Sequence, residues 1–401
     1  MPDADRRLSP WSLLIAACAI LAISLGIRHG FGIYLAPMSR DNDWGREVFA
    51  FAIAMQNLVW GAAQPFTGRL ADRYGAGRAV ALGAIFYVAG LIGMATITSA
   101  SGFVLVTGLL VGIGLAGTSF SVVFGAVGRA VSPERRSMAL GIAGAVGSFG
   151  QFVMLPLGQS VLDIFGWSLA LGMLAALAAL MLPLSLAVTE KPAGATPAAE
   201  MSAGEALRVA SRHGGFWLLS AGYFVCGFQV VFIGTHLPAF LVDKGLSGGT
   251  GAVVLALVGL FNIVGSFLAG HLGARLRKGR LLAAIYFGRA IAIAAFVFLP
   301  ITVASAWAFG IVMGFLWLST VPVTTAVVAG IFGVRNMSML GGIVFFCHQI
   351  GAFLGVWLGG YAYDRLGSYD SVWLIAIALS LVATLLNLPV KEEPVTRLRP
   401  V

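Results

Sequence analysis

The sequence predicts an all-α membrane protein of twelve transmembrane helices, arranged as two pseudo-symmetric halves of six helices each. Three observations lead to this prediction. Hydrophobic residues make up 59% of the 401 residues and charged residues only 10%, with a mean hydropathy of +0.94. The apolar residues form runs near the ~20 residues that cross a bilayer as a helix. The chain also repeats itself after roughly 200 residues.

Twelve apolar runs are long enough to be spans. They cover residues 11–38, 48–67, 79–99, 103–126, 137–162, 167–188, 215–241, 250–272, 281–302, 305–330, 338–363 and 371–389. The first run follows Arg6 and Arg7, as a signal peptide would begin. It is longer than a signal peptide and eleven further runs follow it, so we expect it to be retained as the first helix.

The positive charges follow the predicted topology. If the N-terminus is cytoplasmic, the loop cations on the outer side are only Arg40, Arg46, Lys244 and Arg365. This asymmetry predicts a multi-pass protein of the cell inner (plasma) membrane with both termini cytoplasmic. Because the net charge of +9 is spread over many loops, it does not indicate a nucleic-acid partner.

The longest polar stretch divides the chain in the middle. Residues 189–213 carry prolines and several charges, which is typical of a linker. We therefore predict an N-terminal six-helix bundle over 1–188, a cytoplasmic linker over 189–213, a C-terminal six-helix bundle over 214–390 and a cytoplasmic tail over 391–401.

The two halves share an internal repeat. Gly68, Leu70, Arg73 and Arg78 recur 202 positions later as Gly270, Leu272, Arg275 and Arg280. Ser137, Met138, Gly141, Gly150, Asp163 and Gly166 recur 201 positions later as Ser338, Met339, Gly342, Gly351, Asp364 and Gly367. Duplicated halves place a binding site near the midplane between them, where rocking exposes it to each side in turn.

The loop after the second span carries a specific motif. Residues 68–78 read GRLADRYGAGR, in which Gly75 permits a tight turn and Asp72 can pair with a cation of a neighbouring loop. The pattern G-x-L-x-D-R-x-G-x-x-R resembles the loop signature of the major facilitator superfamily. The predicted gating or latch residues are Gly68, Asp72, Arg73, Gly75, Arg78, Arg135 and Arg136. Simple anchoring of the topology is the alternative.

A second motif narrows the resemblance. Residues 134–144 read ERRSMALGIAG, and further glycines follow at Gly147 and Gly150. This segment resembles the fifth-helix signature of bacterial monocarboxylate and oxalate/formate-type carriers, which implies transport of a small organic anion. One departure is that such carriers typically hold an arginine on the eighth helix, where this chain has Asn262 and Ser266.

Two arginines are predicted near mid-depth in the membrane. A charge there costs about 2.5–3.5 kcal/mol on insertion scales, so Arg28 and Arg289 are candidate functional residues. No Asp or Glu lies deep in a span, and a guanidinium without an acidic partner suits a carboxylate cargo. The resemblance places Arg289 on a supporting helix, as a possible second cation. Alternatively, each arginine satisfies helix-end carbonyls.

Further polar residues in the spans are candidates for cargo binding, although packing and interhelical hydrogen bonds explain them equally well. With Arg28, the predicted substrate-binding residues are His29, Gln56, Gln151, Gln229, His236, Asn262, His348 and Gln349.

Other functions lack support in the spans. No nucleophile–base pair or metal motif occurs at helical spacing, so an enzyme is not expected, and Cys18, Cys226 and Cys347 suggest neither a disulfide nor a metal. We expect no cofactor and a monomer. Coupling to protons, exchange with a counter-anion and uniport all stay open from the sequence. An efflux pump for drugs or amphiphilic metabolites is the alternative function.

Overall fold

The computed structural model describes residues 10–131, 133–188, 203–332 and 337–393, and every regular element in these ranges is helical. The first half comprises α1 (Pro10–His29), η1 (Phe31–Tyr34), α2 (Leu35–Asp41), α3 (Arg46–Tyr74), α4 (Ala76–Thr96), α5 (Ala100–Leu105), the π-helical η2 (Val106–Val111), α6 (Gly112–Thr118), α7 (Phe120–Ala130), α8 (Pro133–Ala179) and α9 (Met181–Ala187). The second comprises α10 (Ala203–Ser211), α11 (Gly214–Asp243), α12 (Gly248–Gly273), α13 (Lys278–Phe298), α14 (Val303–Leu316), α15 (Thr320–Phe332), α16 (Met337–Leu366) and α17 (Asp370–Asn387).

Ten helical stretches in the described residues are long and apolar enough to cross a membrane. One of them, Met138–Ala187, contains both the fifth and the sixth predicted spans, and it bends at Gly166, whose φ is +77°. The second predicted span lies within α3, which is not among the ten. The multi-pass helical fold is therefore confirmed, while the count of twelve spans stays a prediction.

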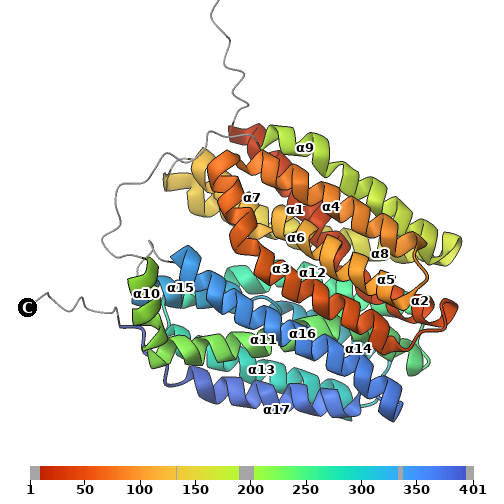
Figure 1. Ribbon diagram of the computed structural model, residues 1–401. Helices are drawn as coiled ribbons and strands as arrows, with labels where there is room; N and C mark the ends of the chain where they lie inside the picture. The colour runs from red at the N-terminus through yellow and green to blue at the C-terminus, as the bar shows by residue number, and fades with distance from the viewer. Residues whose placement is uncertain (1–9, 132, 189–202, 333–336, 394–401) are drawn as a thin grey trace, which may run out of the picture.

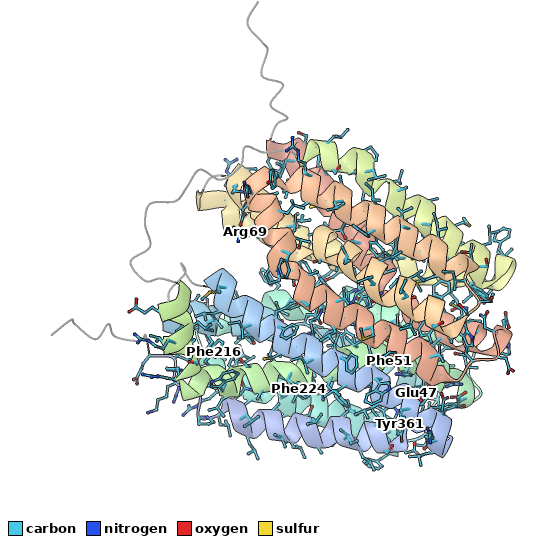
Figure 2. The ribbon with its side chains drawn as sticks, viewed as in Figure 1. Glu47, Phe51, Arg69, Phe216, Phe224 and Tyr361 are labelled. Carbon is cyan, nitrogen blue, oxygen red and sulfur yellow. The ribbon has the colours of Figure 1, made fainter. Side chains whose placement is uncertain are left out.

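The helices form two layered groups (Figure 1). Helices up to α9 occupy the upper part of the view, and α10, α11, α13, α16 and α17 occupy the lower part. We call the end that carries α10 the linker end, and the end that carries Arg46, Asp243 and Asp364 the far end. Figure 2 shows Glu47 and Tyr361 towards the far end and Arg69 and Phe216 towards the linker end.

The internal repeat has a counterpart in packing. A Cβ added at Gly150 of α8 would collide with the backbone of Ala22 in α1, and one added at Gly351 of α16 would collide with the backbone of Phe224 in α11. Gly166 and Gly367 both adopt positive φ, at +77° and +70°. Equivalent glycines thus permit equivalent close helix contacts and equivalent turns in the two halves.

In each half, the membrane helix at the equivalent fourth position is broken. The fourth predicted span is interrupted at Ser119, between α6 and α7, and the tenth at residues 317–319, between α14 and α15. Pro322 lies in the first turn of α15. It has no backbone N–H, so it cannot make the helical hydrogen bond to the carbonyl of Leu318 that would continue α14 into α15. The breaks leave backbone groups to be satisfied by side chains in the middle of the molecule.

The predicted linker and tail are described only in part. Residues 203–211 of the linker form α10, which buries Ala210 against the second half. Residues 189–202 of the linker and 394–401 of the tail lie outside the described residues.

Candidate functional site

A small cavity lies between the two halves, near the middle of the helices. The first half contributes Arg28 and His29 from α1, Gln56 from α3 and Gln151 from α8. The second half contributes residues of α11 and α12, together with Trp317 at the break after α14. The structure thus brings together four of the predicted substrate-binding residues.

Arg28 lies in the last turn of α1, just before the chain tightens into η1. Its Nη2 donates to Oδ1 of Asn57 over 2.8 Å, and its guanidinium carbon lies 5.4 Å from the ring centroid of Trp60. Its buried Nε has no hydrogen-bond partner. The described ion pairs include none to Arg28, so its charge is balanced only by a neutral amide and an aromatic ring.

The ring of His29 is oriented by its own helix. Its Nδ1 lies 2.7 Å from the carbonyl oxygen of Leu25, which can only accept, so Nδ1 carries the proton. In the neutral ring, Nε2 then keeps an acceptor lone pair. His29 can therefore accept a proton or a hydrogen bond from cargo beside Arg28.

Two glutamines flank the cavity in different states. Both amide atoms of Gln56 are buried and have no partner. Gln151 instead donates from Nε2 to the carbonyl of Leu255 over 2.9 Å, which connects the two halves. Gln56 thus keeps its hydrogen-bonding capacity unused beside the cavity, whereas Gln151 already makes an inter-half contact.

Trp317 is a cavity residue that the sequence-based prediction missed. It is 1% exposed, and its Nε1 is buried without a partner. Asn57, the partner of Arg28, was missed as well. The signal available for Trp317 was Pro322, which predicts an interrupted helix shortly before it and hence irregular backbone at membrane depth.

Arg289 does not line this cavity, because its guanidinium is occupied by the backbone of the broken helix. Its Nε and Nη2 donate to the carbonyl of Leu316 over 3.1 and 2.7 Å, and Nη2 also donates to the carbonyl of Trp317. Nη1 donates to Oε1 of Gln229 over 3.3 Å. The alternative interpretation from the sequence, in which a membrane arginine satisfies helix-end carbonyls, therefore applies to Arg289.

Gln229 and His236 on α11 are fully buried away from the cavity. The Nε2 of Gln229 donates to the carbonyl of Ala376 over 2.8 Å. The Nε2 of His236 lies 2.8 Å from the carbonyl of Val356, and its Nδ1 lies 3.2 Å from the hydroxyl of Tyr369. These polar atoms are satisfied within the second half, and neither residue lines the cavity as was expected. Both instead hold helices of the second half together.

The remaining candidates also lie outside the cavity. Oδ1 of Asn262 accepts from the backbone N–H of Leu318 over 2.9 Å, so Asn262 supports the helix break. Nδ1 of His348 lies 3.2 Å from Oε1 of Gln349, and the His348 ring stacks on Phe345. Gln349 packs closely against Gly61 of the other half.

A network of side chains joins the halves at the far end. Nη1 and Nη2 of Arg46 donate to the carboxylate of Asp243 over 2.7 and 2.8 Å, and Nη1 donates to the Tyr369 hydroxyl over 2.8 Å. Burial alone would lower the pKa of Arg46, but the hydrogen bonds to Asp243 and Tyr369 outweigh it and raise that pKa. The carboxylate of Asp364 accepts from the backbone N–H groups of Arg46 and Glu47 over 2.9 and 2.8 Å. We call Arg46, Asp243, Asp364 and Tyr369 the far-end lock.

The predicted latch residues lie at the linker end. Oδ1 of Asp72 accepts from Nη1 of Arg129 over 3.0 Å, and both residues belong to the first half. Gly75 has a φ of +93°, which permits the tight turn between α3 and α4. The other predicted latch residues are Gly68, Arg73 and Arg78 near this turn, and Arg135 and Arg136 in the first turn of α8. Arg135 is exposed, and the side chain of Arg136 lies outside the described residues.

The described residues include no group of three or more His, Cys, Asp or Glu able to hold a metal, and the three cysteines are free. Two helical halves with a cation-bearing cavity between them define a multi-pass membrane carrier. The chain belongs to the Major Facilitator Superfamily, whose family model matches residues 12–321. As predicted, it is a transporter, since this family consists of carriers rather than enzymes.

The relatives agree with this assignment. The chain is 25% identical to the uncharacterized MFS-type transporter YcxA of Bacillus subtilis, over 96% of this chain and 98% of the relative. It is 27% identical to monocarboxylate transporter 11 of Mus musculus (91% and 83% covered) and to monocarboxylate transporter 13 of Bos taurus (94% and 89%). A solved bacterial homologue of the human lysosomal transporter Spinster, inward-facing and unoccupied, shares the fold with a TM-score of 0.73 at 17% identity, over 96% and 95% of the two chains.

Proposed function

We propose that this transporter moves a small organic anion, a monocarboxylate, across the cell inner membrane by alternating access. It acts as a monomer with both termini cytoplasmic. The single observation that carries the proposal is Arg28, a cation beside the cavity between the halves that has no acidic partner and has an unused buried N–H. A planar guanidinium recognises a carboxylate through parallel hydrogen bonds, and the missing countercharge is supplied by the cargo.

The relatives support the monocarboxylate class. Monocarboxylate transporters 11 and 13 match this chain over more than 90% of its length. The departure at Asn262, where carriers of the resembling type hold an arginine, is compatible with the proposal because Arg28 supplies a cation from α1 instead.

The far-end lock supports alternating access. Its hydrogen bonds join α3 of the first half to α11 and α16 of the second. In contrast, the Asp72–Arg129 pair at the linker end lies within one half. Such an arrangement suits a carrier closed at the far end, which with a cytoplasmic linker end corresponds to the inward-facing state.

The cavity suggests two ways in which transport of the anion could be coupled to a second solute. A proton can be carried by Nε2 of His29 beside the bound anion, or a counter-anion can exchange at Arg28. Uptake into proteoliposomes under an imposed pH gradient, compared with uptake against internal carboxylate, separates the two.

The experiment that tests the proposal compares purified wild-type protein with Arg28→Gln. Acetate, pyruvate, lactate and benzoate are screened for thermal stabilisation and for uptake into proteoliposomes, alongside neutral and cationic amphiphilic drugs. We expect a carboxylate to stabilise the wild type. Loss of the charged partner weakens that binding by about 100-fold, as expected for removing a buried charge contact of about 3 kcal/mol.

Arg277→Gln serves as the matched control, since it removes an arginine charge at an exposed position that does not line the cavity. If Arg28→Gln binds and transports carboxylates like the wild type, the site is wrong. If only amphiphilic drugs stabilise the protein, the efflux function replaces the proposed one.

A further inference from the structure

The cavity gathers buried N–H donors that no protein group uses. Arg28 Nε and Gln56 Nε2 come from the first half, and Trp317 Nε1 comes from the second. A buried donor that has no partner is costly, because it has lost its hydrogen bonds to water. An ionised carboxylate is an acceptor with two oxygens and no donor, so one such group can satisfy donors from both halves.

The edge of the indole ring that carries Nε1 lies beside the cavity wall. A Cβ at Gly234 would lie 4.0 Å from Cζ2 of Trp317, the ring atom on the Nε1 side, and Gly234 also lines the cavity. Because Gly234 has no side chain, the space in front of this edge stays open. The Nε1 side of the ring therefore lies near this space and is shielded from bulk water.

The backbone that carries Trp317 is held on both sides of the break. Arg289 donates to the carbonyls of Leu316 and Trp317, and Asn262 accepts from the N–H of Leu318. Hydrogen bonds from a fully buried guanidinium fix these residues although they are outside a helix. The backbone from which the Trp317 indole extends is thus held in place beside the cavity.

We propose that Trp317 is the substrate-binding residue of the second half, whose indole N–H donates to the carboxylate held by Arg28. Arg289 is its positioning residue. This inference rests on the proposed function and deepens it: the anion is held by donors of both halves at once. The cargo therefore carries a compact, ionised carboxylate, and its ester, which has lost the charge, is rejected.

The test measures the affinity of purified full-length protein for pyruvate, lactate and benzoate in the wild type, Trp317→Phe and Trp373→Phe. Phenylalanine removes the N–H and keeps an aromatic ring. Trp373 is the matched control, because it is also buried with an unpartnered Nε1 but packs among Phe232, Phe240 and Phe309 and does not line the cavity. We expect about tenfold weaker carboxylate binding in Trp317→Phe, from losing a hydrogen bond to a charged group, and unchanged binding in Trp373→Phe.

The positioning role of Arg289 is tested by a double-mutant cycle. Arg289→Lys keeps the charge but loses the fork that reaches two carbonyls. We expect it to weaken carboxylate binding several-fold in the wild-type background and to have no further effect in Trp317→Phe. A merely structural role would reduce affinity equally in both backgrounds and would contradict the assignment of Arg289.

The outcomes separate the inference from the proposed function. If carboxylate binding depends on Arg28 while Trp317→Phe binds like the wild type, the inference on Trp317 is overturned and the anion carrier stands. Equal losses in Trp317→Phe and Trp373→Phe also overturn it, because they indicate a packing effect. If the wild type binds no carboxylate, both fail.

Discussion

Arg28 and Arg289 are arginines of membrane helices, one in each half, yet Arg28 is half-buried, Arg289 is fully buried, and their surroundings differ. The Arg289 guanidinium is used by two backbone carbonyls and by Gln229. That of Arg28 has one amide partner, one aromatic neighbour and an unused Nε beside a cavity. Depth in the membrane alone therefore does not identify a binding residue. Its unused hydrogen-bonding capacity is the reason that Arg28 is the proposed binding residue.

The two broken helices show the same contrast. The break at residues 317–319 is held by Arg289 and Asn262, through bonds to three backbone groups. At the break near Ser119, the serine hydroxyl instead accepts from Nε1 of Trp60 over 3.0 Å. Thr118 and Ser24 add a second hydroxyl contact at 2.8 Å. The second half thus fixes its break with a cation, and the first half fixes it with neutral groups and keeps its cation for the cavity.

The largest effect that we expect is on stability. Arg289→Met leaves the carbonyls of Leu316 and Trp317 buried without a partner and lowers the free energy of unfolding by about 3–5 kcal/mol. Arg28→Met loses one bond to an amide and relieves a partly satisfied buried charge, so its change stays below about 1 kcal/mol. Thermal unfolding of both variants in the same detergent measures the difference. Similar losses of stability in the two variants would contradict the contrast between the two arginines.

A middle-sized effect is expected at the two breaks. Asn262→Ala removes the acceptor for the Leu318 N–H and a bond to Ser148, which costs about 2–3 kcal/mol. Ser119→Ala removes the acceptor for Trp60 and a longer, 3.5 Å contact from Gln64, at about 1 kcal/mol. Thermal unfolding ranks the pair, and amide hydrogen exchange over residues 315–321 reports whether the second break opens. Equal losses of stability in the two variants would show that the two breaks are held equally strongly.

The smallest effect is expected at Asp72, the acidic residue of the loop motif that the second half lacks. Asp72 pairs with Arg129, whereas the equivalent position in the second half is Ala274. Because the Asp72 side chain is 65% exposed, Asp72→Asn should change stability by less than about 1 kcal/mol. A reduced transport rate with normal melting would indicate a gating role, and a normal rate would leave the motif as a topology anchor.

The structure brings some of the predicted site residues together and separates others, and the residues show why. Arg28, His29, Gln56 and Gln151 share one cavity, because the spans that carry them converge between the halves. Gln229 and His236 were predicted on one face of α11, and that face turned out to contact α16 and α17. Helical spacing relates residues on the same face, but it does not tell which neighbour that face meets.

The sequence by itself determined the membrane class, the multi-pass helical fold, the internal repeat and the family, because hydropathy, charge asymmetry and turn glycines act locally along the chain. Only the tertiary structure decided which arginine is satisfied and which is not. That distinction depends on carbonyls freed by the break after Leu316, and these reach Arg289 from another helix. The same holds for Trp317, whose unused N–H becomes meaningful only when the helices of both halves enclose it with Arg28.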